Sequence, residues 1–346
     1  MVKIYKKVLL FAAVLASGVV MAGNPDRQGE AGANQLLINP WARSAGLHSI
    51  NIGSVSGTEA MYLNVAGLSR MRSTELNLSH TRYLEGAELG VNALGFARKL
   101  GKGAFGVSLV AFDMGDLDFT TENNPEGGTT FSPSFFNLGL SYSHSFDSKV
   151  SVGITAKLVN ESATSVSAKA FAIDAGVQYV AGDDDNFKFG ISLRNVGSKM
   201  RFTGEGLSKS LPNPGPNFDY NNVYYERSAI YDLPSQLNIG ASYDWILGRN
   251  SRLSALGNFT SNAFSRDQVG FGLELKIKEL FAIRSAYKFE FDSNEIERTL
   301  DNGLSAGMSV ALPLGKNSEN RVALDYAYRS TFVYRGTHNV ALRFEF

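Results

Sequence analysis

The sequence predicts an all-β protein: a transmembrane antiparallel β-barrel of about fourteen strands, preceded by an N-terminal hatch segment. Three observations support this prediction. Apolar and polar residues alternate with a period of two from about Thr74 to Phe346. Most of the alternating runs exceed the mean strand length of soluble proteins, about 5–6 residues. Long and short connections also alternate along the chain. Because side chains alternate across a strand, each run has one apolar and one polar face.

The first 22 residues predict a secretory signal peptide. Three lysines, Lys3, Lys6 and Lys7, precede the short apolar run Val8–Val20, and Ala22 ends a cleavage site of small residues. The apolar run is shorter than the roughly 20 residues of a membrane-spanning helix; a membrane-anchoring N-terminal helix is the alternative interpretation. We expect export through the Sec pathway and three segments: signal peptide 1–22, N-terminal periplasmic or hatch segment 23–73, and barrel 74–346.

The alternating runs define the expected strands. Roughly 9–11 tilted residues cross a membrane, and most runs reach or exceed this length. Counted from the first strand, the long connections 119–133, 199–232 and 292–301 are the third, seventh and eleventh. In an outer-membrane barrel with a periplasmic N-terminus, odd-numbered connections form the long outer loops and even-numbered ones form the short periplasmic turns. The predicted strands are 75–82, 87–100, 103–118, 134–146, 149–166, 169–181, 187–198, 233–247, 251–263, 266–278, 280–291, 302–313, 321–333 and 336–346.

Composition and motifs exclude several functions. Lys and Arg (33) balance Asp and Glu (33), which argues against a nucleic-acid binder, and no cysteine is present for a disulfide scaffold or a thiolate metal site. Residues Gly101–Gly106 match G-x-G-x-x-G, but a strand follows where a dinucleotide site needs a helix. The four histidines lack metal-ligand spacing, and no G-x-S-x-G is present. We therefore expect no catalytic residue, no cofactor, no metal and no enzyme activity.

The polar faces of the strands carry charges of both signs. A wide lumen of mixed charge needs internal neutralisation, so we expect these side chains to pair with one another. The alternative is that they line a path for water. The charged residues expected to face the lumen are Lys157, Asp174, Lys188, Arg194, Asp244, Glu274, Lys276, Arg284, Lys288, Glu290, Asp325, Arg329, Arg343 and Glu345.

Two stretches of the hatch segment carry a family resemblance. Trp41–Gly46 reads Trp-Ala-Arg-Ser-Ala-Gly, and Glu59–Leu68 reads Glu-Ala-Met-Tyr-Leu-Asn-Val-Ala-Gly-Leu. They resemble the PorV/PorQ family of the Bacteroidota, which is itself similar to FadL-type fatty-acid channels. That family usually has Asn-Pro-Ala-Gly-Leu, and this chain has Val65 at the proline position. The hatch motif that the resemblance marks comprises Arg43, Asn64, Ala66 and Gly67.

The hatch segment also has an expected place in the fold. Thr58–Ser69 predicts a short helix that ends near Gly67. A segment of this size cannot form its own core. A barrel of about fourteen strands is wide enough to hold it, so we expect the segment to lie in or under the barrel.

The resemblance implies an outer-membrane barrel connected with type IX secretion, as a component or partner that binds secreted cargo proteins or the large translocon barrel. Its further expected partners are outer-membrane lipid and, during biogenesis, the barrel assembly machinery; no nucleic acid is expected. The alternative is a FadL-like transporter of long-chain fatty acids or other hydrophobic small molecules. An apolar lumen pocket beneath the hatch would favour transport, whereas the polar lumen that the strand phasing predicts favours an interaction protein.

The connection 199–232 is a candidate partner-binding loop. Stiff aromatic surface gives an interface contact area at low entropic cost. The alternative is a loop that folds into the barrel mouth as a lid and protects its own aromatic side chains. The candidate residues are Pro212, Pro214, Phe218, Tyr220, Tyr224, Tyr225 and Tyr231.

The last strand carries a candidate barrel assembly signal. Its apolar face consists of Val340, Leu342, Phe344 and the terminal Phe346. This pattern resembles the C-terminal signal that the insertion machinery of outer-membrane barrels reads by strand pairing. A core strand that simply ends the chain is the alternative.

Overall fold

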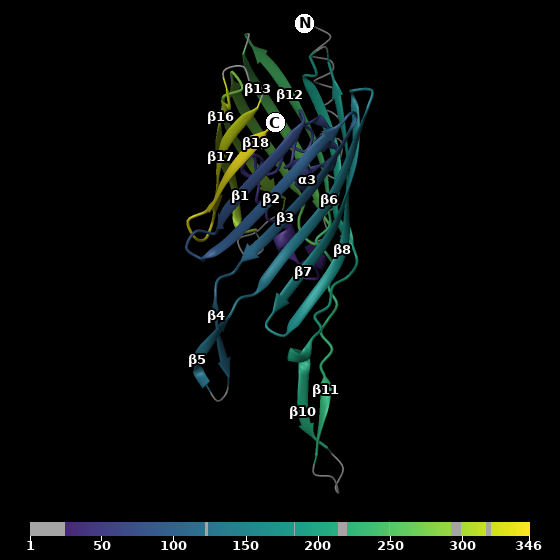
Figure 1. Ribbon diagram of the computed structural model, residues 1–346, viewed down its shortest axis with the longest axis vertical. Helices are drawn as coiled ribbons and strands as arrows, with labels where there is room; N and C mark the ends of the chain where they lie inside the picture. Colours follow the sequence, from purple (N-terminus) through teal and green to yellow (C-terminus); the bar gives the residue numbers. More distant parts are fainter. Residues whose placement is uncertain are drawn as a thin grey trace.

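Fourteen strands close into an antiparallel barrel in the computed structural model, as predicted (Figure 1). Each strand pairs with its neighbours in the barrel order, and the first pairs with the last to close the ring. The barrel strands are β1 (Thr74–Tyr83), β2 (Leu89–Leu100), β3 (Gly103–Asp113), β6 (Ser134–Phe146), β7 (Val150–Ala163), β8 (Val166–Ala181), β9 (Phe187–Gly197), β12 (Gln236–Leu247), β13 (Ser251–Asn262), β14 (Gln268–Ile277), β15 (Phe281–Glu290), β16 (Asp301–Pro313), β17 (Arg321–Thr331) and β18 (Thr337–Glu345).

The structure describes residues 25–121, 124–182, 184–213, 220–248, 250–291, 299–315 and 320–346. The predicted signal peptide, residues 1–22, lies outside them. Within the described residues, no helix is long and apolar enough to cross a membrane.

Strand β8 illustrates why the alternating sequence forms the wall. Its side chains are alternately buried and exposed along most of its length. Asp174 and Gln178 point into the lumen and are buried, whereas Phe171 and Val177 are exposed on the outer surface. An apolar outer face around a polar interior is the arrangement that a closed barrel needs in a bilayer, because every backbone group is paired and only apolar side chains meet lipid.

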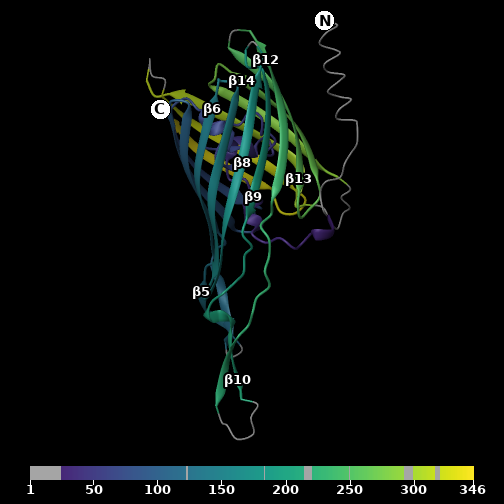
Figure 2. The ribbon, with the colours of Figure 1, turned by 90° about the vertical axis from the view of Figure 1, so that its right-hand side faces the viewer.

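Two β-hairpins extend the barrel at the end where the long connections lie (Figures 1 and 2). One consists of β4 (Leu117–Thr121) and β5 (Asn124–Phe131). The other consists of β10 (Ser208–Pro212) and β11 (Asn221–Tyr225), preceded by the 3-10 turn η4 (Glu205–Leu207). The opposite end has short turns, and the C-terminus lies there. By the outer-membrane loop rule, the hairpin end is extracellular.

The first hairpin corrects the predicted strand 103–118. Strand β3 ends at Asp113, and β4 begins at Leu117. Gly115 has a φ of 70°, and its backbone N–H donates to Asp113 Oδ1 at 3.0 Å. This local turn stops the barrel strand, because a positive φ and a side-chain cap both interrupt the ladder.

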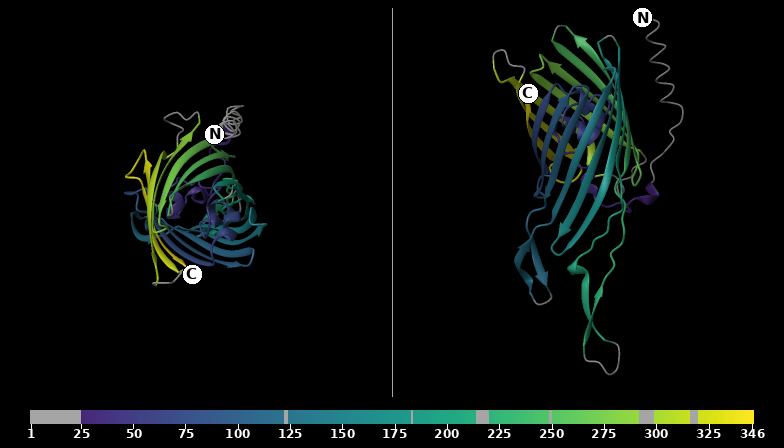
Figure 3. Two further views of the ribbon diagram at one scale, coloured as in Figure 1. Left: turned by 90° about the horizontal axis from the view of Figure 1, so that it is seen from above. Right: turned by 45° about the vertical axis from the view of Figure 1, so that its right-hand side comes forward.

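Most of the hatch segment lies inside the barrel, as Figure 3 shows from above, whereas its first turn (Pro25–Arg27) lies outside the wall (Figure 2). The predicted continuous helix over Thr58–Ser69 is wrong, because Asn64 adopts an extended conformation and splits it. The extended backbone lets the Asn64 side chain cap the second helical piece, Val65–Arg70, by accepting a hydrogen bond from the backbone N–H of Ala66. The hatch elements are η1 (Pro25–Arg27), η2 (Asn34–Leu37), α2 (Ala42–Ala45), α3 (Ala60–Leu63) and η3 (Val65–Arg70).

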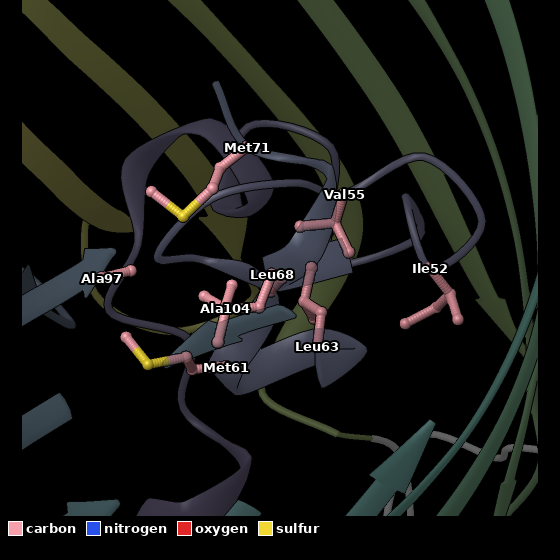
Figure 4. Packing of buried hydrophobic residues seen from close by; sticks show 9 residues of the cluster. Ile52, Val55, Met61, Leu63, Leu68, Met71, Ala97 and Ala104 are labelled. Carbon is pink, nitrogen blue, oxygen red and sulfur yellow. The ribbon is translucent and has the colours of Figure 1, made fainter. Parts of the chain in front are cut away.

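The hatch and the wall share a small apolar core (Figure 4). Leu63 and Leu68 of the hatch are fully buried, together with Ala97 of β2 and Ala104 of β3. The wall contributes small side chains here and the hatch contributes large ones. The segment therefore gains a core by entering the barrel, as its short length requires.

Candidate functional site

The hatch is fastened to the barrel wall by side-chain amides. Asn64 Nδ2 donates to the carbonyl of Val177 on β8 at 3.0 Å and to that of Ile52 at 3.1 Å. From the wall, Gln178 Nε2 donates to the carbonyls of Ile52 (3.1 Å) and Val55 (3.0 Å). Asn64, Gln178 and the hatch residues Ile52 and Val55 are buried, so these bonds supply hydrogen-bond partners that the hatch backbone cannot obtain from water.

Glycines on the lumen face of the wall let the hatch approach closely. A methyl group added at Gly176 of β8 would collide with Asn64 Oδ1. One added at Gly190 of β9 would lie 2.6 Å from the carbonyl oxygen of Ile52, and one at Gly153 of β7 would lie 2.7 Å from the hatch backbone. The sequence analysis did not single these glycines out. Their signal was the recurrence of glycine on the polar faces of neighbouring strands.

Buried carboxylates hold the first part of the hatch motif. Glu59 accepts hydrogen bonds from the backbone N–H groups of Arg43 (3.2 Å) and Ser44 (3.0 Å) in the first turn of α2. The Arg43 guanidinium lies 3.3 Å from Glu59 Oε1 and 3.9 Å from Glu75 Oε1. Burial alone would lower the pKa of Arg43, but Glu59 and Glu75 raise it above its ordinary value. Arg43 therefore stays charged inside the hatch.

The remaining hatch-motif residues are packed rather than exposed. Ala66 is fully buried, and its carbonyl accepts from Ser143 Oγ on β6 at 2.9 Å. A side chain at Gly67 would collide with the carbonyl of Val55. Val65, which stands where the resemblance expects proline, is also buried. Arg43, Asn64, Ala66 and Gly67 thus all lie where the hatch folds on itself or meets the wall.

Many lumen charges pair with one another. Ion pairs between neighbouring strands lie on the lumen face of the wall, among them the following four. Their shortest N–O distances are 2.7 Å for Lys157–Asp174, 2.6 Å for Lys188–Asp244, 2.9 Å for Arg284–Glu274 and 3.2 Å for Arg343–Asp325.

A polar cavity of about 350 Å³ lies at the hairpin end of the lumen. His48, Ser49 and Tyr62 of the hatch line one side of it, and Arg194 and Arg329 of the wall line another. On the opposite side of the hatch, a cavity of about 60 Å³ is lined largely by charged and polar residues as well. Among the described residues, neither cavity is the apolar pocket that transport of a hydrophobic molecule would favour.

The long connection divides into a base and a tip. At the base, Tyr231 packs against an apolar cluster that includes Leu36 of the hatch and Met200 of the connection itself, and its hydroxyl donates to Glu161 at 2.8 Å. At the tip, Tyr224 and Tyr225 are exposed on β11, in the projecting hairpin. The base therefore covers part of the mouth, whereas the tip points away from it (Figure 2).

The other candidate loop residues lie around the hairpin turn. Pro212 ends β10, and Tyr220 is exposed just before β11. Pro214 and Phe218 lie outside the described residues.

The candidate assembly signal lies on the closing strand of the barrel. Val340 and Leu342 of β18 are exposed on the outer face, and Phe346 is exposed beyond its end. Phe344 is half-buried and pairs in register with Leu76 of β1. This places the four side chains at the seam that closes the barrel; their reading by an assembly machinery stays a prediction.

Comparisons with known proteins show which solved structures share this fold. No protein-family model matches the chain, and no curated protein matches it. Among solved structures, the Ralstonia pickettii toluene transporter TbuX matches at TM-score 0.52 and 15% identity, over 89% of this chain and 97% of that one. The P. putida toluene transporter TodX matches at TM-score 0.52 and 13% identity, over 86% and 97%. A TodX monoaromatic hydrocarbon channel mutant matches at TM-score 0.51 and 14% identity, over 87% and 99%.

These similarities cover nearly the whole of each solved chain, so the shared feature is the complete barrel. At such identities they establish the fold alone. Together with the apolar outer face and the enclosed hatch, they show that this chain has the fourteen-strand barrel fold of the TodX and TbuX channels, a β-barrel of the outer-membrane type.

Proposed function

We propose that this barrel binds a protein at its extracellular end and acts as a component or partner of a type IX secretion system. One observation carries the proposal: two β-hairpins continue beyond the barrel and expose aromatic and apolar side chains there. Exposed apolar surface on a rigid element is typical of protein-interaction sites.

The hairpin β10–β11 offers the larger share of this surface. Val223, Tyr224 and Tyr225 are consecutive and exposed, with Tyr225 at 65%. Since side chains alternate along a strand, Tyr224 and Tyr225 lie on opposite faces of the hairpin. An ion pair between Lys209 and Glu226, 2.6 Å apart, accompanies the strand pairing near the base. The ladder stiffens the hairpin, so a partner would lose little conformational entropy there.

The lumen supports a binding role in another way. The hatch is fixed by buried hydrogen bonds from Asn64 and Gln178, and the cavities on both of its sides are polar. The secretion context itself comes from the resemblance of the hatch motif to the PorV/PorQ family. In that family, cargo recognition takes place outside the membrane, which is where these hairpins project.

An affinity purification tests the proposal. The tagged protein is isolated from native outer membranes and the co-purifying chains are identified by mass spectrometry. We expect a very large translocon barrel, or secreted proteins that share a C-terminal domain. The double variant Tyr224→Ser/Tyr225→Ser should reduce their recovery at least tenfold. The matched control Ser208→Ala/Asn221→Ala changes the same hairpin but keeps its aromatic residues, and it should recover the wild-type set.

Two results would contradict the proposal. One is recovery of the barrel alone under conditions that preserve other outer-membrane complexes. The other is unchanged recovery of the partners by the tyrosine variant while its barrel remains folded.

Transport of hydrophobic small molecules is the second candidate. Its support is the fold shared with structures named as toluene transporters and monoaromatic hydrocarbon channels. Uptake of labelled toluene or a labelled long-chain fatty acid into liposomes that contain the purified barrel tests it. Uptake above that of empty liposomes would favour transport, and uptake equal to that of empty liposomes would reject it.

A further inference from the structure

The cations of the lumen differ in how they are compensated. Lys157, Lys188, Arg284 and Arg343 each lie within 3.2 Å of a carboxylate oxygen. Three other cations surround the cavity at the extracellular mouth, and among the described residues none of them lies within 4.0 Å of a carboxylate. These are Arg194, Lys288 and Arg329.

Within the described residues, Arg329 shows most clearly a buried cation that lacks a compensating partner. Its side chain, on β17, lines the mouth cavity, and the residue is only 5% exposed. Its Nε and Nη2 atoms are buried and have no hydrogen-bond partner in the described part of the chain. An uncompensated buried charge costs several kcal/mol. An anion in the cavity would remove this cost.

The two neighbouring cations point to the same requirement. Arg194 is 4% exposed, and its partners are neutral: Gln236 Oε1 and the carbonyl of Leu36, both at 3.3 Å, and the ring of Tyr62 at 4.0 Å. Lys288, on β15, is half-buried and lines the same cavity. Three positive side chains therefore converge on one space without a bonded carboxylate.

Two carboxylates also line the cavity and reduce the net charge. Asp301 and Glu290 line it together with Arg194, Lys288 and Arg329, so among the described lining residues cations exceed anions by three to two. Glu290 is engaged elsewhere, since its Oε2 accepts from the backbone N–H of Thr299 at 3.1 Å. The described lining thus gives the cavity a positive potential, which the low-dielectric walls strengthen.

The rest of the lining indicates a hydrophilic ligand. Ligand cavities usually measure about 300–1,000 Å³ and are mostly apolar. This one, at about 350 Å³, lies at the small end and is rich in amides and hydroxyls. Such groups exchange hydrogen bonds with hydroxylated ligands. They are Ser49, Gln236, Asn238, Asn262, Gln268 and Asn302.

We propose that the mouth cavity binds a small, hydroxyl-rich anion of sugar-acid or sugar-phosphate type, whose oxyanion pairs with Arg329 and whose hydroxyls meet the surrounding amides. Guanidinium groups suit both carboxylate and phosphate oxygens. The site is separate from the projecting hairpins, so it goes beyond the proposed function and does not depend on it.

Calorimetric titration of the purified full-length barrel in detergent tests the site. The probes are D-glucuronate, D-glucose 6-phosphate and D-glucose, which share a ring and differ in charge. We expect at least one of the two anions to bind at least tenfold more tightly than glucose. The stronger anion identifies a carboxylate or a phosphate as the preferred group. Arg329→Gln should weaken anion binding at least tenfold. The control Lys209→Gln also removes a positive charge, but on the projecting hairpin, and it should leave anion binding unchanged.

Three results would overturn the proposed site. They are absence of anion binding at millimolar concentration, binding of glucose as tight as that of both anions, or unchanged anion affinity in Arg329→Gln. If Arg329→Gln does not fold, Lys288→Gln takes its place. That variant should lower anion affinity several-fold, and an unchanged affinity would reject the proposal.

Discussion

Asn64 of the hatch and Val177 of the barrel wall are joined by a hydrogen bond of 3.0 Å from the asparagine amide to the valine carbonyl. The two residues are 113 positions apart in sequence. This bond lies where the hatch comes nearest to the wall, beside Gly176. Asn64, which bonds both to the wall and to the hatch itself, therefore fixes the hatch in the lumen together with Gln178 and Ser143 of the wall.

Replacing Asn64 by alanine should loosen the hatch. Asn64→Ala removes the amide that donates to Val177 and Ile52, and the Ile52 carbonyl keeps only its bond from Gln178; each lost hydrogen bond is worth about 0.5–1.5 kcal/mol. We expect a lower midpoint of urea unfolding and a higher single-channel conductance in planar bilayers. Asn221→Ala, in the exposed hairpin, is the control. A variant with wild-type conductance and wild-type stability would contradict the anchoring role.

A methyl group on the wall should act like the loss of the anchor. Gly176→Ala would bring its Cβ into collision with the Asn64 side chain, and overpacking of this kind costs about 1–3 kcal/mol. Gly257→Ala is the matched control, because its nearest neighbour is Phe271 at 3.9 Å. Urea unfolding in lipid vesicles compares them. Equal midpoints for the two variants would show that the close approach carries no energetic weight.

Lys157 and Asp174 should stabilise the barrel only when both are present, so removing one of them should cost more stability than removing both. Asp174→Asn leaves Lys157 buried and uncompensated, and such a loss costs about 3–5 kcal/mol. The asparagine can still accept the 2.7 Å hydrogen bond from the backbone N–H of Asn195 on β9, so the register shift between β8 and β9 at this point should persist. Adding Lys157→Met should recover most of the stability. A double variant as unstable as Asp174→Asn alone would refute this electrostatic account.

His48 should make the barrel less stable in acid. Burial, aided by Lys288 and Arg329 and opposed by Asp301, lowers its pKa from 6.5 to about 4. Between these two pH values the unfolded chain binds a proton that the folded chain does not, so stability is lost as the pH falls. The pKa difference corresponds to about 3 kcal/mol.

His48→Asn tests this pH dependence. Asparagine tolerates the positive φ of 49° at this position. The variant should flatten the slope of stability against pH between pH 6.5 and 4, as measured by urea unfolding in detergent. A slope as steep as that of the wild type would assign the acid sensitivity to other groups.

The barrel could be predicted from sequence because its signal is local and repeated. In β6, the alternation of Phe136, Leu138 and Leu140 with polar residues determines the face of every side chain, and the predicted and observed bounds coincide. The ends were harder to predict, because they depend on single residues. The end of β3 is set by the turn at Gly115 and its cap from Asp113, which lie within an otherwise strand-like run.

The hatch and the mouth cavity could be predicted only in part. The resemblance marked Asn64, but not its wall partner Gln178, because that contact joins residues far apart in sequence. The charges expected in the lumen included both Lys157 and Arg329. Only the strand register reveals that Lys157 has a carboxylate diagonally across from it on the next strand, whereas Arg329 has none among the described residues. Pairing across a sheet depends on register, which one sequence leaves undetermined.

The pairing of β1 with β18 also constrains how this chain can fold. The closing seam joins Glu75 to Glu345, so the ring cannot be completed until the last strand is available. The hatch precedes every barrel strand in sequence, yet its apolar residues are covered only within the finished ring. Contacts between such distant segments form slowly, because the entropy of closing the loop is lost first. The earliest part of the chain must therefore remain soluble longest, and protection of the hatch from premature association should limit the yield of folded barrel.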